Sequence, residues 1–291
     1  MASHRPVTTD GATTALRRSV EALTPESGAR EVVADLLAAL ESAEVRAATR
    51  HDDGRWEAVP WVKHGILMGF RLGVLADLSP RDASGRRVPP FSFIDKDLLP
   101  SRAFSIADGV RIVPGGTTVR RGAHLGQRVT CMPPAFVNVG AFIDCDTVVD
   151  SHALVGSCAQ IGARVHLSAG AQIGGVLEPV NASPVVVEDD AVVGGNCGVY
   201  EGVVVRSRAV LGAGVILTRS VAVYDVVNEA VYRATSDRSL EIPPGAVVIA
   251  GTRPASGGWA RDRGLAITTP IIVKYRDAKT DAATVLEAAL R

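Results

Sequence analysis

An aspartate and a histidine two residues apart, Asp150 and His152, are the side chains best suited to chemistry. A carboxylate close to an amine can orient it or accept its proton, and an imidazole titrates near neutrality, so each is a candidate general base. Each also has a structural interpretation. The aspartate could be a solvated corner residue, and the histidine could simply fill space at an exposed corner.

The four cysteines do not indicate a metal site or a disulfide. Their positions lack the Cys-x-x-Cys spacing that is typical of zinc and redox sites. Two of them fall on small apolar positions of the repeat described next. We therefore expect all four to be reduced and to act as small apolar fillers: Cys131, Cys145, Cys158 and Cys197.

The elements that must position these side chains follow a six-residue period. Between residues 113 and 223 a small apolar residue recurs at every sixth position, and another small residue usually follows four residues later. This period fits neither a helix nor an ordinary strand, and it predicts a left-handed parallel β-helix of hexapeptide repeats with about six triangular coils. The expected inward positions are Val113, Val119, Leu125, Cys131, Val137, Ile143, Val149, Val155, Ile161, Leu167, Ile173, Val187, Val193, Val199, Val205, Leu211, Leu217 and Val223.

One interruption of the repeat is expected to be a loop. Ile173 and Val187 are fourteen residues apart, two more than twice the period, and residues 174–184 between them are bounded by glycine and proline. Loops that leave a rigid scaffold are where binding residues tend to lie.

The segments on either side of the repeat divide the chain into three expected parts. Residues 1–105 are predicted to form an N-terminal helical domain, 106–251 the β-helix, and 252–291 a C-terminal strand and helix. Helical periodicity covers residues 15–23, 30–50 and 62–77, whereas Trp56–Val59 indicates a strand. Residues 225–241 are expected to form a hairpin, 243–251 a last partial coil, 267–275 a strand, and 281–290 a helix that could cap the prism.

Composition limits the range of partners and locations. Of 291 residues, 47% are apolar, which is ample for a packed core. The formal net charge is zero, so nothing favours nucleic acid or an anionic membrane. The first residues lack an apolar signal core, and no apolar run reaches eighteen residues, so a soluble cytoplasmic protein is expected.

Several strings of the repeat resemble the tetrahydrodipicolinate N-succinyltransferase family of lysine and diaminopimelate synthesis. The most specific are Gly-Ser-Cys-Ala-Gln-Ile-Gly at 156–162 and Gly-Gly-Val-Leu-Glu-Pro at 174–179, and the resemblance covers almost the whole chain. It implies a homotrimer, succinyl-CoA as donor, a small amino dicarboxylate as acceptor, and active sites between neighbouring prisms.

Two substrate-contacting positions of that family match this chain. Its arginine in Arg-Val-Val-Pro corresponds to Arg111, and its aspartate in Val-Asp-Thr-Trp corresponds to Asp150. An arginine can hold a carboxylate through two parallel hydrogen bonds, which suits a dicarboxylate acceptor. The resemblance therefore favours a site role for Asp150. Lys274 and Lys279 are candidates for contacting coenzyme A because of their charge and location.

Two departures from the family pattern suggest a divergent paralogue. The acidic residue of Arg-Ser-Glu-Val-Val-Glu-Gly becomes Gly198, and the tryptophan of Val-Asp-Thr-Trp becomes His152. Loss of a carboxylate and of a bulky aromatic changes both the charge and the volume of the pocket. We therefore expect an acceptor that differs from that of lysine synthesis, with His152 as the candidate replacement base.

The sequence therefore predicts a CoA-dependent N-acyltransferase that needs no metal. Succinyl-CoA is the expected donor, and acetyl-CoA with specialised amino-acid metabolism is the alternative. A non-catalytic paralogue that binds coenzyme A remains a second alternative. A third is a metal-dependent carbonic anhydrase of the same fold, which would need His124, His152 and His166 to converge on one metal, although the hexapeptide count puts them on three different faces.

Overall fold

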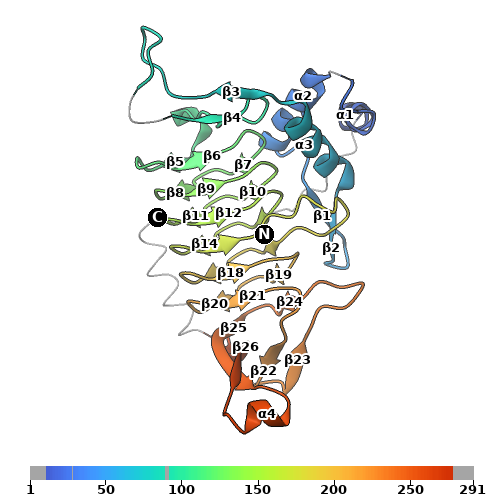
Figure 1. Cartoon of the computed structure of the whole chain (residues 1–291), viewed down its shortest axis with the longest axis vertical. Helices are drawn as coiled ribbons and strands as arrows, with labels where there is room; N and C mark the ends of the chain where they lie inside the picture. The colour runs from blue at the N-terminus through green and yellow to red at the C-terminus, as the bar shows by residue number, and fades with distance from the viewer. Residues whose placement is uncertain (1–10, 28, 89–91, 278–291) are drawn as a thin grey trace.

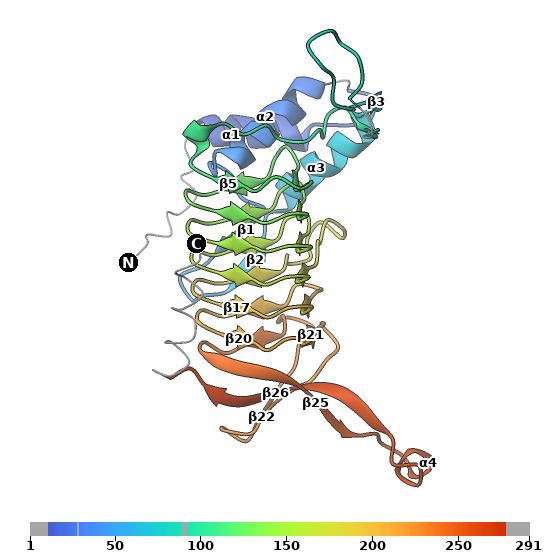
Figure 2. The same cartoon turned by 90° about the vertical axis from the view of Figure 1, so that its left-hand side faces the viewer.

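A computed structural model of the chain describes residues 11–27, 29–88 and 92–277. Its centre is a left-handed parallel β-helix whose three flat faces form a prism, with helices at one end and a long antiparallel ribbon at the other (Figures 1 and 2). The fold class predicted from the hexapeptide period is therefore confirmed. No helix among the described residues is long and apolar enough to cross a membrane.

Each face of the prism is a ladder of two-residue parallel strands, and each coil contributes one strand to every face. Face 1 consists of β5 (Arg111–Ile112), β8 (Thr130–Cys131), β11 (Val148–Val149), β14 (His166–Leu167), β17 (Val192–Val193) and β20 (Val210–Leu211). Face 2 consists of β6 (Thr118–Val119), β9 (Phe136–Val137), β12 (Leu154–Val155), β15 (Gln172–Ile173), β18 (Gly198–Val199) and β21 (Ile216–Leu217). Face 3 consists of β7 (His124–Leu125), β10 (Phe142–Ile143), β13 (Gln160–Ile161), β16 (Val186–Val187), β19 (Val204–Val205) and β24 (Glu241–Ile242).

The second residue of each strand points into the prism. These residues form one continuous buried cluster with the small residues at the corners, as the period predicts. Burying one such side chain contributes about 1.5–3 kcal/mol.

The three fully buried cysteines belong to the interior or to a corner, Cys145 is partly exposed, and all four are free thiols, as expected. Burial raises the pKa of both Cys131 and Cys158 to about 12.

The first coil shows that the start of the repeat was misplaced. Ile112, and not Val113, aligns with Cys131 in the next coil, a separation of nineteen residues instead of eighteen. The extra residue is accommodated in the turn at Gly115 and Gly116, which have φ angles of 142° and 98°. Glycine reaches such angles without steric cost, so the turn can absorb one residue before the period begins.

The interruption at residues 174–184 is a loop, but no hexapeptide is skipped. Val187 pairs with Ile161, so the strand after β15 is simply the next strand of face 3. The pairing spans 26 residues where an uninterrupted coil spans 18, so the loop inserts eight residues (26 − 18 = 8) into the corner between faces 2 and 3.

The N-terminal segment contains shorter helices than predicted. The three helices are α1 (Gly11–Glu21), α2 (Arg30–Glu41) and α3 (Pro60–Leu72). The helix expected to reach residue 50 ends at Glu41, because Ala48–Arg50 (β1) pairs with Trp56–Ala58 (β2), the strand that was predicted. The helix expected to reach residue 77 ends where Gly73 is extended, and Leu75–Asp77 (β3) pairs with Ile94–Lys96 (β4).

Face 3 is covered by the chain itself. Ala48 and Trp56 of the β1–β2 hairpin pack on Val186 and Val204. Arg46 donates to Gln160 (Nε to Oε1, 2.9 Å), and its guanidinium carbon lies 3.6 Å from the centre of the Phe142 ring. Burial lowers the pKa of Arg46 to about 10.

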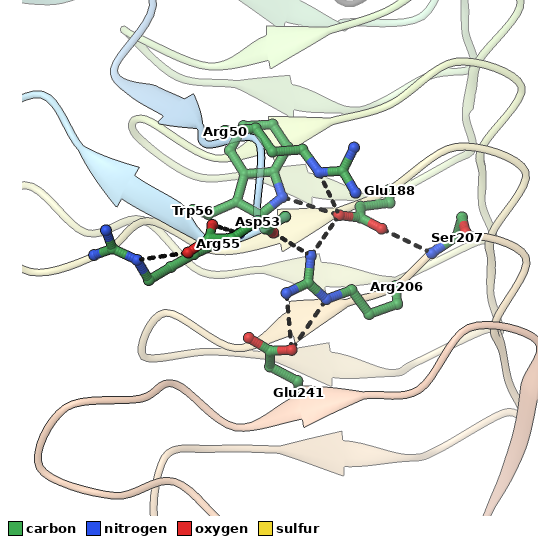
Figure 3. Close-up of polar contacts among 9 residues, drawn as sticks. Arg50, Asp53, Arg55, Trp56, Glu188, Arg206, Ser207 and Glu241 are labelled. Carbon is green, nitrogen blue, oxygen red and sulfur yellow. Dashed lines mark hydrogen bonds and ion pairs between the residues drawn. The ribbon is translucent and has the colours of Figure 1, made fainter. Parts of the chain in front are cut away.

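A polar network holds the same hairpin against the prism (Figure 3). Glu188 accepts hydrogen bonds from Trp56 Nε1 at 3.0 Å and from Arg206 Nη1 at 2.8 Å. Arg206 Nη1 also donates to the carbonyl of Gly54 in the hairpin turn at 2.7 Å. The second guanidinium nitrogen, Arg206 Nη2, donates to Glu241 Oε2 at 2.8 Å. Glu188 is thus the central acceptor of the network.

The C-terminal elements extend beyond the prism. The predicted hairpin is present as β22 (Val223–Asp225) and β23 (Ala230–Tyr232). The expected partial coil is only the first part of β25 (Ala246–Pro254), which continues past the prism and pairs antiparallel with β26 (Ala266–Tyr275), the predicted strand. The four-residue helix α4 (Gly258–Arg261) lies at the tip of this ribbon (Figure 2). The helix predicted at 281–290 lies outside the described residues.

The network in Figure 3 predicts the cost of removing its central acceptor. Glu188→Ala leaves the buried Trp56 N–H without its acceptor and removes one partner of Arg206, so we expect a loss of about 1–3 kcal/mol in the free energy of unfolding, measured by denaturant titration. Asp52→Ala, at an exposed position of the same hairpin turn, is the control and should leave stability unchanged. Equal stability of both variants would show that the network does not hold the hairpin.

Candidate acceptor site

The edge between faces 1 and 2 carries Asp150 and His152. Both lie in the turn that joins β11 to β12, directly after the inward residue Val149. Asp150 Oδ1 accepts the backbone N–H of Ser151 at 2.7 Å, which fixes the carboxylate at the turn. This leaves Oδ2 directed at the neighbouring coil.

The imidazole nearest Asp150 is that of His166, not that of His152. His166 Nε2 lies 4.0 Å from Asp150 Oδ2, and its side chain is mostly buried. Residues eighteen apart stack on one face of the prism, so Val148 aligns with His166, and Asp150 is two residues further along. This spacing was available in the sequence, where His166 was considered only as a metal ligand.

His152 occupies a strained corner with an exposed side chain. Its φ is 62°, in the left-handed region, and its backbone N–H donates to the carbonyl of Pro134 at 2.5 Å. Its carbonyl in turn accepts from Gln172 Nε2 at 3.3 Å. The backbone is therefore held firmly, while the imidazole extends toward the solvent and could meet a ligand.

The three histidines that a shared metal site would need, His124, His152 and His166, occupy separate positions on the prism. His124 lies on face 3, where its ring stacks on Phe142 and its Nδ1 is 2.8 Å from the carbonyl oxygen of Glu41. Burial lowers its pKa, so the ring stays neutral and Nδ1 carries the proton. His166 lies on face 1 and His152 at the edge between faces 1 and 2. Within the described part of the chain, no three His, Cys, Asp or Glu side chains gather where they could hold one metal ion.

Arg111 lies on the same face as Asp150 but two coils away. It is the outward residue of β5, and β8 lies between β5 and β11, so the two backbones are separated by about 10 Å along the prism. The side chain is exposed, and among the described residues it forms no ion pair. A long guanidinium side chain can bridge such a separation to a ligand that Asp150 also contacts.

The candidate contacts to coenzyme A are only partly described. Lys274 lies on β26 with Nζ 3.7 Å from Asp277 Oδ2, and nearly half of its side chain is exposed. Lys279 lies outside the described residues. The ribbon that carries Lys274 lies at the end of the prism opposite the helices (Figures 1 and 2), and the strands β25, β20, β17 and β14 separate β26 from β11, the strand that precedes Asp150.

A groove of about 670 Å³ opens at the other edge of face 2. Its walls are the inserted loop and the corners after β18 and β21, and they include Gly174, Tyr200, Glu201, Arg219 and Ser239. Sequence reasoning identified the loop as a candidate binding element but did not identify Tyr200, Arg219 or Ser239. Gly198, where the expected acid is missing, lies on β18 next to this groove.

The loop that borders the groove is fastened to α3 by a buried lysine. Lys63 is fully buried and its Nζ donates to the carbonyl of Ala182. Burial lowers the pKa of this amine. Leu177 of the same loop packs on the core that α3 shares with the prism residues Val139 and Cys158. The groove is therefore bounded by anchored elements on both sides.

Within one chain the two halves of the candidate site are separated. Asp150 and His152 lie at the edge between faces 1 and 2, just before β12, whereas the groove lies at the edge between faces 2 and 3. Gly198 is on β18, which is two coils further along face 2 than β12. The structure brings Asp150 next to His166 and leaves the His152 side chain exposed in the same turn, and it brings neither Asp150 nor His152 near the groove.

Comparison with known proteins relates the N-terminal segment and the hexapeptide repeat to one family. The description "tetrahydrodipicolinate N-succinyltransferase N-terminal" matches residues 15–72, and "hexapeptide repeat of succinyl-transferase" matches residues 184–219. The chain is similar to a 2,3,4,5-tetrahydropyridine-2,6-dicarboxylate N-succinyltransferase from Polynucleobacter asymbioticus, with 39% identity over 92% of this chain and 93% of that protein. Enzymes of the same name from Nitrobacter winogradskyi and Burkholderia ambifaria are 38% and 40% identical, over 93% and 90% of this chain and 94% and 89% of theirs.

Proposed function

The chain belongs to the tetrahydrodipicolinate N-succinyltransferase family of acyltransferases, and from this premise we propose that it transfers a succinyl group from succinyl-CoA to the amine of tetrahydrodipicolinate or of a related amino dicarboxylate. The observation that carries the proposal is the identity of 39% across nearly the whole of both chains, which includes both edges of face 2.

The proposed reaction is a direct acyl transfer. The free amine of the acceptor attacks the thioester carbonyl, the new C–N bond forms, and the C–S bond breaks to release coenzyme A as its thiol. Asp150 orients the amine and accepts the proton that it loses. Backbone N–H groups at the coil corners stabilise the oxyanion of the tetrahedral intermediate. The chain itself supplies the base and the donors, so the step needs no covalent enzyme intermediate.

A related acceptor is favoured over tetrahydrodipicolinate itself by the change at Gly198. The strings that match the family place an acid there, and the glycine removes a charge next to the groove. We propose that the protein acts on a dicarboxylate of similar size whose amine is free at neutral pH. Release of the CoA thiol, followed with a panel of amino dicarboxylates and with succinyl-CoA and acetyl-CoA, tests acceptor and donor together. Absence of thiol release with every pair would favour a non-catalytic CoA-binding protein.

We predict that the chain is a trimer in solution. Faces 1 and 2 carry outward apolar side chains such as Val148, Val192 and Leu154, whereas face 3 is covered by the hairpin. A trimer covers these faces and brings the Asp150 edge of one copy to the groove of the next. Light scattering should give three times the mass of the chain, and a stable monomer at micromolar concentration would remove the basis for a shared site.

Asp150→Asn should abolish acyl transfer and leave binding of coenzyme A intact. The amide keeps the size and the hydrogen bond to Ser151 but cannot accept a proton. His152→Ala is the matched variant in the same turn and should cause a smaller loss, since a proton-transfer role is worth about 10²–10⁴-fold. Turnover and calorimetric CoA binding measure the two effects. A larger loss for His152→Ala than for Asp150→Asn would assign the base to the histidine.

Arg111→Lys should raise the acceptor KM strongly and leave the donor KM nearly unchanged. The exchange keeps the charge but loses the two parallel hydrogen bonds to a carboxylate, a cost of roughly 1.5–3 kcal/mol. Steady-state kinetics with either substrate varied measures both constants. Unchanged acceptor kinetics would give Arg111 a structural role only.

A further inference from the structure

Three successive corners of the prism carry the same short-range hydrogen bond. The Oδ1 atoms of Asn138, Asp144 and Asp150 accept the backbone N–H of the following residue at 2.9, 2.7 and 2.7 Å. Each of the three comes directly after the inward residue of its strand. The bond is therefore a recurring feature of these turns, and by itself it gives Asp150 no special role.

Asp150 differs from the other two in the residue that the next coil places beside its strand. For the three turns, the outward residue on the next strand of the same face is Leu154 for Asn138, Gln160 for Asp144 and His166 for Asp150. The amide of Gln160 is engaged by Arg46 and by the carbonyl of Cys158. The imidazole of His166, in contrast, has its Nε2 atom 4.0 Å from Asp150 Oδ2.

A histidine departs from the pattern of outward residues on face 1. The corresponding residues on β8, β11, β17 and β20 are all β-branched, which suits a pleated surface: Thr130, Val148, Val192 and Val210. The His166 side chain is only 16% exposed, and both of its ring nitrogens are shielded from solvent. Burial of a polar ring costs free energy unless a polar group compensates it, and the Asp150 carboxylate is such a group.

Backbone hydrogen bonds fix the two residues relative to each other. The N–H of Asp150 donates to the carbonyl of Leu167, the neighbour of His166, at 2.9 Å, and the N–H of His166 donates to the carbonyl of Ala191 at 3.0 Å. A separation of 4.0 Å between Nε2 and Oδ2 is longer than a hydrogen bond, so the contact is electrostatic. A proton on Nε2 attracts Oδ2 and limits the directions that the carboxylate can take.

We propose that His166 is a positioning residue for Asp150 in the acyl transfer. The N–H of Ser151 holds Oδ1 and the buried imidazole holds Oδ2, while each oxygen keeps a lone pair for the acceptor's amine. The Asp150 side chain is 33% exposed, so the amine can approach it from solvent, whereas the shielded ring nitrogens act only through the carboxylate. This inference rests on the proposed acyl transfer and adds the residue that orients its base.

His166→Leu removes both ring nitrogens and keeps an apolar side chain of similar size. We expect kcat to fall about 10- to 100-fold, because a reacting group misplaced by about 1 Å can cost about 100-fold in rate. The acceptor KM and the calorimetric affinity for coenzyme A should stay nearly unchanged, since the ring contacts neither substrate. An unchanged kcat in the folded variant would overturn the inference.

Two amides at the same position separate orientation from packing. The amide nitrogen of His166→Gln can lie near the position of Nε2 and should recover most of the lost kcat, whereas the shorter side chain of His166→Asn cannot reach it and should not. This comparison also decides the question if His166→Leu does not fold. Equal kcat values for the two amides would show that the ring acts only by filling space, and the inference would be wrong.

His124→Leu is the matched control. His124 is a partly buried outward histidine of face 3, where its Nδ1 is 2.8 Å from the carbonyl oxygen of Glu41. Its loss disturbs the packing on the prism at a distance from Asp150, so kcat per folded protein should match the wild type even if the melting temperature falls. An equal loss of kcat in His124→Leu and His166→Leu would assign the effect to the prism as a whole and contradict the inference.

Failure of this inference can be told apart from failure of the proposed function. If the wild-type protein releases CoA thiol with amino dicarboxylates and every His166 variant keeps the wild-type kcat, His166 has no positioning role and the acyl transfer stands. If the wild-type protein releases no thiol with any acceptor, the proposed function fails and the inference fails with it.

Discussion

The structure depends on one constraint, the requirement that every sixth residue fill the interior of the prism. From Val119 onward each inward side chain is fully or almost fully buried, and three of them close one coil of eighteen residues. Because this register is fixed by burial, a slip of one residue would turn the apolar set outward. Where a coil carries no insertion, an outward residue therefore stacks on the one eighteen positions away, at a spacing of about 4.8 Å. The scaffold thereby places functional side chains on rows along its faces and edges.

The same regularity explains which parts of the fold could be predicted from the sequence. The inward positions from Val119 onward, the loop after Ile173 and the hairpin after Val223 follow from local spacing. The errors occur where pairing is not local. Ile112 replaces Val113 because Gly115 and Gly116 absorb an extra residue, and two helices end early because the strands that follow them find partners elsewhere in the chain. A helical pattern does not reveal a competing strand.

The candidate site also has one feature that could be predicted from the sequence and one that could not. The eighteen-residue spacing aligns Val148 with His166, and Asp150 is two residues after Val148, so the proximity of Asp150 and His166 could have been found from the sequence. The arrangement of Tyr200 over Gly198 could not, because it depends on the direction in which one side chain leaves a corner. A sequence comparison registers a lost acid at 198 and an unrelated tyrosine two positions later. Only the geometry shows that the ring of the tyrosine occupies the space that a side chain at position 198 would need.

The β1–β2 hairpin determines which faces of the prism are left open to another copy of the chain. The network of Trp56, Glu188 and Arg206 covers face 3 with the chain's own N-terminal segment, so faces 1 and 2 are the ones left for another copy (Figure 3). Asp150 lies at one edge of face 2 and the groove of Tyr200 at the other. A rigid prism cannot fold to bring these edges together, so within the proposed trimer each site must take its base from one copy and its groove from the next. The interior packing that determines the register of the coils would then also set the distance between Asp150 of one copy and the groove of the next.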